Sequence, residues 1–293
     1  MPAVDSTGAR TSRRKTPAQA PPPDMSEVLV MKPEEFLQWW AKTFKAGMHC
    51  VIMGQTGSGK TVLEIFLCSV RKYVLALDAK GGDTSLSQSR WPRITRWPLP
   101  YSIRQQVKDG KEPVRIIIGK PARTKVQRTA NRELLRKVVP DLWEQGKWCV
   151  VCDEGQILAD RRYVGVGDEL EEMLIAARDR GLSLIFTIQR PQIGRTTPAA
   201  SASISQSTFV AVARTRDSRV HNRLAEIVGR PAAEVRGLIK ALPQFAWAIF
   251  SLDPYDPIRI VIPPPLKPLK KNGRGEVVQT SRFSQWMWGS NAA

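Results

Sequence analysis

The chain has little cysteine, little histidine and no long apolar segment. Four cysteines in 293 residues are too few for a disulfide scaffold, and His49 and His221 are too few and too scattered for a catalytic or metal constellation. No apolar run approaches the roughly 18 to 20 residues of a membrane span. The basic N-terminal stretch leads into Ala and Pro, unlike a signal peptide. We therefore expect a cytoplasmic protein without a transmembrane segment or, for a viral source, one of the host cytoplasm or virion.

Acidic residues are also scarce relative to basic ones. Lys and Arg total 45 against 27 Asp and Glu, which gives a net charge of +18 and a pI near 10.2. This excess points to a polyanionic partner, either nucleic acid or an acidic membrane surface. Hydrophobic residues make up 42 % and charged residues 25 %, so a sizeable core is expected and global disorder is excluded.

Polar, proline-rich tails flank the body of the chain, residues 25–262. Residues 1–24 are basic and lack periodicity, which is typical of a flexible, disordered arm. Residues 263–293 open with three prolines, carry several Lys and Arg, and end in Trp286-Met287-Trp288. This end is a docking peptide for a protein partner, a membrane-surface anchor, or an aromatic tail packed on its own domain.

Between the tails, short apolar runs alternate with helix-like segments. The apolar runs predict strands at residues 48–53, 73–78, 114–118, 148–152, 182–188, 208–213 and 245–252. The helical patterns lie at residues 60–71, 129–145, 168–180 and 216–228. Near-continuous apolar strands that alternate with helices indicate a mainly parallel sheet covered by helices, in a single α/β domain.

The first predicted strand runs directly into Gly54-Gln55-Thr56-Gly57-Ser58-Gly59-Lys60-Thr61, which matches G-x-x-x-x-G-K-[ST]. Glycines let the backbone curl around phosphate oxygens, and the next helix offers its N-terminal amides to the anion. Lys60 would reach the β- and γ-phosphates of ATP, and the Thr61 hydroxyl would coordinate Mg²⁺. The predicted nucleotide-binding residues are Gly54, Gln55, Thr56, Gly57, Ser58, Gly59, Lys60, Thr61 and Val62.

An apolar strand that ends in Asp153-Glu154 supplies the acidic partner that such a loop needs. Asp153 would bind Mg²⁺, directly or through water, and Glu154 would be the general base that activates water. A base placed beside the metal ligand favours hydrolysis over a slow nucleotide switch. Gln189 ends the predicted strand 182–188, at the edge where open α/β sheets bind ligands. It would sense the γ-phosphate or orient the attacking water, unless it is an ordinary loop residue.

Together these elements resemble the FtsK/HerA branch of P-loop ATPases, which includes DNA pumps, conjugative coupling proteins and viral genome-packaging motors. The resemblance covers roughly residues 45–255. It rests on the GQTGSGKT loop, Leu77-Asp78-Ala79-Lys80-Gly81-Gly82-Asp83, CVVCDE, ARDRG before the strand that ends in Gln189-Arg190-Pro191, and Thr215-Arg216-Asp217-Ser218-Arg219. This resemblance implies a RecA-like core that assembles as a homo-oligomeric ring, expected to be a hexamer, and moves double-stranded DNA by ATP hydrolysis.

Two departures from the family pattern stand out. Glu64 occupies a position in the helix after the glycine loop where the family has an apolar residue, so we expect a polar face there. The sequence also shows neither the membrane-spanning part nor the winged-helix module of the cellular chromosome pumps. The chain is closer in size to the packaging ATPases of viruses and mobile elements.

The charge is concentrated in one segment, residues 90–147, with 15 Lys and Arg against five acids, or +10. Such a stretch is either a phosphate-binding surface with strongly salt-dependent affinity or an ordinary solvated face. Aromatic residues interleaved with it, Trp91, Trp97 and Tyr101, are expected to pack rather than to stack on bases. Cys149 and Cys152 form C-x-x-C within a predicted strand, where positions three apart point to opposite faces, so we expect core thiols.

The loop, Asp153 and Glu154 provide a lysine, a metal ligand and a base, but not a guanidinium at the transferred phosphate. An arginine finger inserted from a neighbouring subunit would supply it. Arg178 is the first choice, because it stands where the resembling ATPases carry an arginine; Arg180, Arg214, Arg216 and Arg219 are the others. Alternatively, these arginines pair with acids such as Asp179, Glu171 or Glu172 on a helix surface.

A DNA-translocating ATPase is the leading functional hypothesis. A helicase or recombination ATPase that acts on single strands is the first alternative. A DNA-bound adaptor that uses ATP as an assembly switch is the second, and the Asp153-Glu154 pair argues against it because it supplies a base.

Overall fold

The structure is a computed structural model, and it describes residues 28–82, 84–189, 198–253 and 255–266. The expected arm, residues 1–24, lies outside these ranges, as do residues 267–293 of the expected tail with the Trp-Met-Trp end. Arg190 and Pro191, which form part of the family resemblance, also lie outside them. In the described part of the chain, no helix combines the length and the apolar character needed to cross a bilayer.

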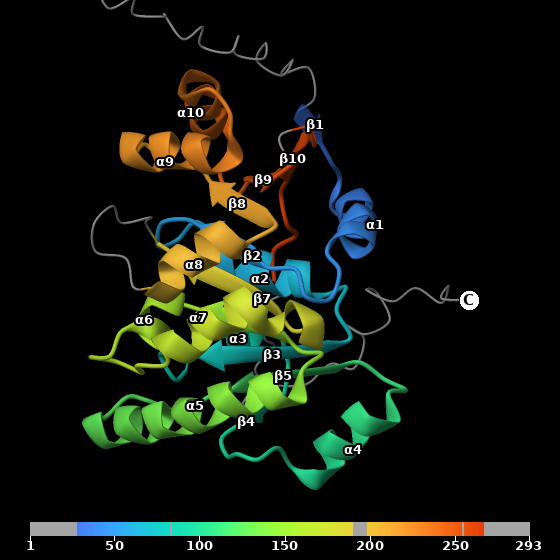
Figure 1. The fold of residues 1–293 in the computed structure, drawn as a ribbon, viewed down its shortest axis with the longest axis vertical. Coiled ribbons are helices and arrows are strands. Elements are labelled where there is room, and N and C mark those ends of the chain that lie inside the picture. Colours follow the sequence, from blue (N-terminus) through green and yellow to red (C-terminus); the bar gives the residue numbers. More distant parts are fainter. Residues whose placement is uncertain (1–27, 83, 190–197, 254, 267–293) are drawn as a thin grey trace, which may run out of the picture.

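The described residues form one ten-stranded sheet with helices between the strands (Figure 1). The strands are β1 (Val28–Val30), β2 (Cys50–Met53), β3 (Tyr73–Asp78), β4 (Arg93–Ile94), β5 (Val114–Ile118), β6 (Cys149–Asp153), β7 (Ser183–Ile188), β8 (Phe209–Ala213), β9 (Trp247–Ser251) and β10 (Ile258–Val261). The helices are α1 (Pro33–Thr43), α2 (Lys60–Cys68), α3 (Thr84–Gln88), α4 (Tyr101–Asp109), α5 (Lys125–Gln145), α6 (Gly155–Ala159), α7 (Gly167–Ala176), the 3₁₀ turn η1 (Ala177–Arg180), α8 (Pro198–Gln206), α9 (Ser218–Val228) and α10 (Ala232–Ala241).

The strand order across the sheet is β1-β10-β9-β8-β2-β7-β6-β3-β5-β4. β9 is antiparallel to both of its neighbours, β8 and β10, whereas the other neighbouring pairs of the described sheet are parallel. The predicted α/β class, with a mainly parallel sheet covered by helices, is therefore confirmed. Because β9 is reversed, its first residue, Trp247, pairs with Ala213, the last residue of β8. β9 thus begins at the edge where the parallel strands end.

Two hydrophobic cores lie on opposite faces of the sheet, since successive strand residues point to opposite sides. In β2, Val51 and Met53 belong to the core beneath α5, α7 and α8, whereas Cys50 and Ile52 belong to the core beneath α1 and α2. The strands are apolar throughout because both of their faces are covered. In β6, Cys149 and Cys152 fall into different cores and are fully buried, as expected of core thiols.

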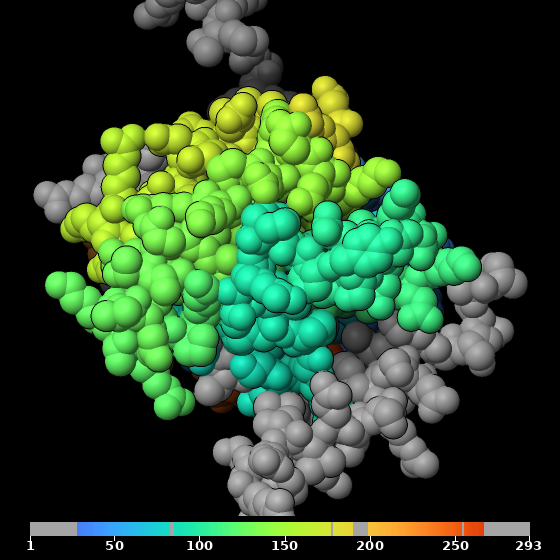
Figure 2. Space-filling model, turned by 90° about the horizontal axis from the view of Figure 1, so that it is seen from below, coloured from blue at the N-terminus to red at the C-terminus, as the bar shows by residue number. Residues whose placement is uncertain are grey.

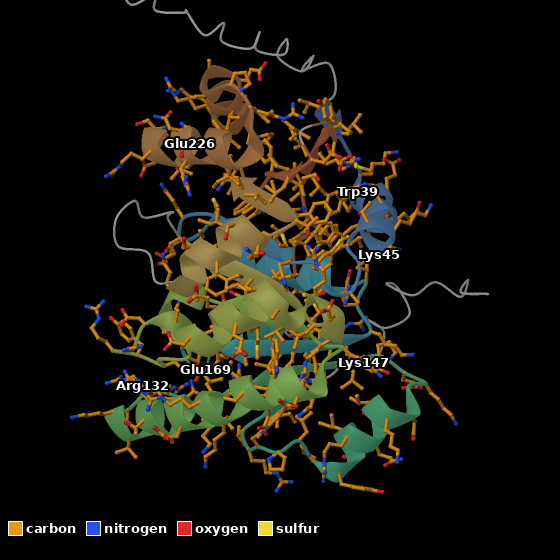
Figure 3. All side chains as sticks on the ribbon, in the orientation of Figure 1. Trp39, Lys45, Arg132, Lys147, Glu169 and Glu226 are labelled. Atoms are coloured by element: carbon orange, nitrogen blue, oxygen red, sulfur yellow. The ribbon has the colours of Figure 1, made fainter. Side chains whose placement is uncertain are left out.

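Helix α1 anchors the helix that follows the glycine loop. The Trp40 indole N–H donates to the Leu67 carbonyl of α2 over 3.0 Å, and Phe36 stacks on Phe66 with ring centroids 5.8 Å apart. Trp39, labelled in Figure 3, meets Phe209 of β8 edge-on and carries the Arg259 guanidinium 3.9 Å above its ring. Fully burying one such side chain contributes about 1.5–3 kcal/mol. These contacts fix α2, and with it the end of the loop, against the sheet.

The expectation of a polar face around Glu64 is wrong. Glu64 is fully buried in α2, where most residues of the helix are also buried, and the Thr187 hydroxyl of β7 donates a hydrogen bond to its carboxylate. Helix α2 lies between the sheet and α1, so a polar residue on its inner side meets β7 rather than water. The Thr187 hydroxyl bonds one oxygen of this buried carboxylate, which lowers the cost of burying it.

Candidate functional site

The glycine loop connects the end of β2 to the start of α2 in a conformation that only glycine adopts freely. Gly57 and Gly59 have φ of +81° and +87°, in the left-handed region. A Cβ atom on Gly54 would lie 2.5 Å from the Ser58 Oγ atom, so the loop closes only without a side chain there. The result is a small cradle in front of the free amides of α2, which suits a phosphate group.

Lys60 is the first residue of α2 and lies over this cradle. It is 8 % exposed, and its Nζ donates to the Gln55 carbonyl of the same loop over 3.1 Å. The Gln55 amide in turn donates to the Thr215 hydroxyl over 3.5 Å, which links the loop to the segment that follows β8. The loop is therefore held on both sides, and its only cation points inward.

Asp153 is the last residue of β6 and Glu154 follows it; β6 is separated from β2 by β7 alone. Asp153 is 4 % exposed. Glu154 has φ of +56°, a left-handed value that is uncommon for a residue with a side chain and is frequent where function requires strain. The backbone turns at Glu154, because β6 ends at Asp153 and α6 begins directly after Glu154. The two carboxylates therefore leave the backbone in different directions.

The Glu154 carboxylate is held by two side chains. Lys80 Nζ lies 2.7 Å from Oε1, and the Gln189 Nε2 donates to Oε2 over 2.8 Å. Burial acts to raise the pKa of Glu154, but the hydrogen bond and charge of Lys80, the Gln189 amide and the charge of Lys60 outweigh it and lower that pKa below 4.5. Glu154 is thus ionised at neutral pH, as a proton acceptor must be.

The predicted residues Gln189 and Glu154 are therefore brought together, at the ends of adjacent strands β7 and β6. Lys80 is a site residue to which sequence reasoning assigned no role, although it belongs to the motif after β3. The sequence alone gave no signal for this contact, because it depends on β3 lying directly beside β6 in the sheet, which places a lysine two residues past the end of β3 next to Glu154. Its 2.7 Å contact with a residue 74 positions away follows from the sheet order.

The loop that carries Lys80 is itself anchored by Asp78, the last residue of β3. The Asp78 carboxylate accepts hydrogen bonds from the Gly81 and Gly82 amides over 2.8 and 2.7 Å, and Arg93 Nη1 lies 2.7 Å away. The Asn131 amide donates to the Asp78 carbonyl over 3.0 Å. Asp78 is 1 % exposed, so these charge-assisted bonds are shielded from water. They fix the position from which Lys80 reaches Glu154.

Thr61 and Asp153 are the residues that could hold Mg²⁺. Thr61 lies in the first turn of α2 and Asp153 at the end of β6, so both face the edge that holds the glycine loop. Among the described residues, no cluster of three or more His, Cys, Asp and Glu exists. Mg²⁺ at phosphate sites needs only one or two protein ligands beside waters and phosphate oxygens, so this pair fits the ion.

The arginine candidates fall on two edges of the sheet. Arg178 and Arg180 lie in η1, ahead of β7, on the edge opposite the glycine loop, whereas Arg214 and Arg216 follow β8 on the loop's own edge. Arg178 is exposed. Arg180 lies 3.5 Å from Glu144 and 4.9 Å above the Trp143 ring, so it pairs with α5 and not with Asp179 or Glu171. Arg219 lies 3.5 Å from Asp217.

The basic segment 90–147 covers β4, α4, β5 and α5, and it occupies much of the face in Figure 2, in teal and green. Figure 3 shows two of its residues, Arg132 and Lys147, toward opposite ends of α5. Some of its arginines serve the fold: Arg115 donates to the Ser69 and Arg71 carbonyls. The exposed members are Arg96, Arg104, Lys108, Lys111, Arg123, Lys125, Arg128, Arg136, Lys137 and Lys147.

The interleaved aromatics differ from one another. Trp91 and Trp97 pack against the two cores, as expected, and the Trp97 indole donates to Asp141 over 2.5 Å. Tyr101 is 71 % exposed, so the expectation that it packs is wrong. It opens α4 at the outer surface, where the Arg104 guanidinium lies 5.9 Å from its ring.

A glycine loop between a parallel strand and a helix, faced by a carboxylate two strands away, is the arrangement of P-loop NTPases, and this chain has their fold. No family model matches the sequence, and no curated protein is similar to it. Among solved structures, VirB4 of Thermoanaerobacter pseudethanolicus matches 73 % of this chain and 88 % of its own, with a TM-score of 0.50 and 10 % identity.

Two further solved structures are similar at lower TM-scores. The genome packaging NTPase B204 of Sulfolobus turreted icosahedral virus 2, in complex with ATPγS, has a TM-score of 0.48 and 18 % identity over 75 % of this chain and 98 % of its own. The pCW3 conjugation coupling protein TcpA has a TM-score of 0.41 and 17 % identity, over 74 % of this chain and 60 % of its own. At such identities the similarity concerns the fold.

Proposed function

We propose that the protein is an ATPase that moves double-stranded DNA through a homo-oligomeric ring. The observation that carries the proposal is Glu154, ionised and held between Lys80 and Gln189 beside the phosphate cradle. A nucleotide switch needs the cradle alone, whereas an oriented carboxylate is useful for activating water. The DNA part of the proposal is supported by the exposed basic segment 90–147.

The residues divide the work of hydrolysis among them. The glycine-loop amides and Lys60 bind the phosphates, and Glu154 takes the proton from a water molecule that attacks the γ-phosphorus. Gln189, bonded to Glu154, orients that water through its amide group. Mg²⁺, held by Thr61 and Asp153, neutralises phosphate charge when bound. An arginine from a neighbouring subunit, with Arg178 the first candidate, completes the charge stabilisation.

ATP hydrolysis measured with and without long duplex DNA tests the proposal. We expect steady turnover that duplex DNA stimulates several-fold, and displacement of a third strand from a duplex as the protein moves along it. Stimulation by single strands alone would select the helicase, and binding of ATP with negligible turnover would select the adaptor.

Glu154→Gln is the matched test of the base. It keeps the size and shape of the side chain but removes its charge, replaces one accepting oxygen by an NH2 group and cannot take up the proton, so ATP should still bind while hydrolysis is lost. Glu112→Gln, the same change on the exposed surface, is the control and should hydrolyse ATP at the parent rate. Parental turnover in Glu154→Gln would contradict the assignment of the base.

A further inference from the structure

Phe245 stands two residues before the reversed strand β9, and its ring lies beside the glycine loop. Because β9 is antiparallel to β8, its start lies at the nucleotide edge, next to the loop. A Cβ atom on Gly59 would lie 3.5 Å from the Phe245 Cδ1 atom, so the ring touches the loop at the residue before Lys60. The large apolar ring is nevertheless 51 % exposed.

The backbone of Phe245 is also strained. Its φ of +62° lies in the left-handed region, which bulky residues rarely adopt. Phe245 is the third residue of a turn that is closed by a hydrogen bond from the Ala246 amide to the Pro243 carbonyl over 3.2 Å. Glycine would fit this turn without strain, so the sequence keeps an aromatic side chain where the backbone disfavours it. Strain of this kind gathers at ligand clamps.

The position of Phe245 matches one end of a nucleotide. The hydrolytic groups, Glu154 and Gln189, lie on the β6–β7 side of the loop, so the γ-phosphate points to that side. Phosphates that run across Lys60 and Thr61 place the nucleoside on the opposite side, toward β8 and β9. Phe245 is the exposed aromatic residue there that touches the loop.

We infer that Phe245 forms the base subsite of the nucleotide site, where its ring stacks on the purine of ATP or ADP. This inference rests on the nucleotide binding proposed above. Stacking uses the flat face of a base and makes no hydrogen bond to its edge, so the subsite favours any purine nucleotide over bare phosphate chains. It raises the affinity for nucleotide and leaves the chemistry at the γ-phosphate unchanged.

The test compares the affinities of the magnesium complexes of ADP and of inorganic pyrophosphate, measured by titration calorimetry. Phe245→Ala should weaken ADP binding by roughly 5- to 100-fold, the range that base–aromatic stacking gives, with pyrophosphate affinity unchanged. GDP should lose as much as ADP, and Phe245→Tyr, which keeps the ring, should bind ADP like the parent. In ATP hydrolysis the loss should appear in KM rather than in kcat.

Two controls separate the possible outcomes. Tyr255→Ala removes an aromatic residue that is 86 % exposed beyond the other end of β9, and it should leave both affinities unchanged. Phe245→Gly removes the ring but suits the backbone at φ +62°, so it folds if Phe245→Ala does not. Unchanged ADP affinity in Phe245→Ala or Phe245→Gly, or an equal loss for ADP and pyrophosphate in either, would overturn the base subsite. Failure of the parent protein to bind either ligand would instead overturn the proposed function.

Discussion

The two edges of the sheet are built differently. At the edge where the parallel strands end, Lys80, Glu154 and Gln189 are joined by direct bonds within one chain. At the opposite edge, Arg178 is exposed and Arg180 is bound to α5. The first edge thus holds a pre-formed base and phosphate cradle. The second carries an exposed arginine that lies away from the cradle of its own chain, so under the proposed ring assembly we predict that a neighbouring subunit's arginine completes the site.

Mixing two inactive variants tests this difference most strongly. An inserted arginine is worth on the order of 10³ to 10⁵ in rate, so Arg178→Ala should lose most ATP hydrolysis although its own loop is intact. Lys60→Ala should lose it although its arginine is intact. Hydrolysis should recover when the two are mixed, because some interfaces then combine an intact loop with an intact arginine. Full activity of Arg178→Ala alone would remove this residue from the candidates.

Measuring DNA affinity at several salt concentrations tests whether either edge of the sheet contacts DNA. The basic segment predicts sequence-indifferent binding that weakens steeply with salt, and each neutralised phosphate contact lowers the slope of log affinity against log salt by about 1. One triple variant replaces Arg123, Lys125 and Arg128, which lie past β5 at the nucleotide edge. The other replaces Arg104, Lys108 and Lys147 at the opposite edge.

Each triple change to glutamine should make the slope shallower, that is less negative, if DNA lies along the whole segment. A loss confined to one triple would assign the contact to that edge. A parent slope that implies only one or two released counterions would mean that the segment is an ordinary solvated surface.

The stability of the arginine edge should depend on pH through His49. Burial, with the charge of Arg178 second, lowers the pKa of His49 from 6.5 to about 4, and its neutral Nδ1 accepts from the Leu184 amide over 3.0 Å. As pH falls below 6.5, His49 therefore becomes protonated in the unfolded chain but stays neutral in the folded chain. Unfolding free energy should fall by at most about 3 kcal/mol between pH 6.5 and pH 4.

Denaturant unfolding of His49→Asn and of the parent at several pH values measures this contribution. The variant should show a flatter dependence between pH 6.5 and 4, whatever its absolute stability. Parallel curves for the two proteins would show that His49 does not titrate in this way.

At the nucleotide edge, replacing Lys80 should have the smallest effect of the changes considered, and it should appear in the pH dependence of hydrolysis. Lys80→Met removes the hydrogen bond and charge that lower the pKa of Glu154, so that pKa should rise. A base is active only above its pKa, so hydrolysis in the variant should fall more at acidic pH than at pH 8. The control is Lys111→Met on the exposed surface. An acidic limb at the same pH in variant and parent would show that Lys80 does not tune the base.

The sequence predicted the central strands, the glycine loop and the acidic pair because each depends on a local pattern. Apolar runs located β3 and β5 to the residue, and the spacing of Gly54, Gly57 and Gly59 located the loop. Short or amphipathic elements such as β1, β4 and α4 have too few periodic residues for such a signal. The ion pair of Lys80 with Glu154 depends on strand order, and the left-handed backbone of Phe245 leaves no trace in composition.

The burial of Glu64 shows the same limit. A glutamate in a helix usually indicates a water-facing side, but α2 is covered by α1 and the sheet, and Thr187 supplies the partner. The pairing joins residues from different elements, so tertiary packing decides it. Comparison with the family pattern showed that a glutamate at position 64 is unusual. It did not show that Thr187 would bond the buried carboxylate.

The reversal of β9 gives the α9–α10 pair two attachments to the same edge. The chain leaves β8 past Thr215, which bonds Gln55, forms the two helices, and returns past Phe245, which touches Gly59. The α9–α10 pair, near the top of Figure 1, is thus joined to the glycine loop at two points, Gln55 and Gly59. A displacement of these two helices as a body therefore acts on the loop at both points at once.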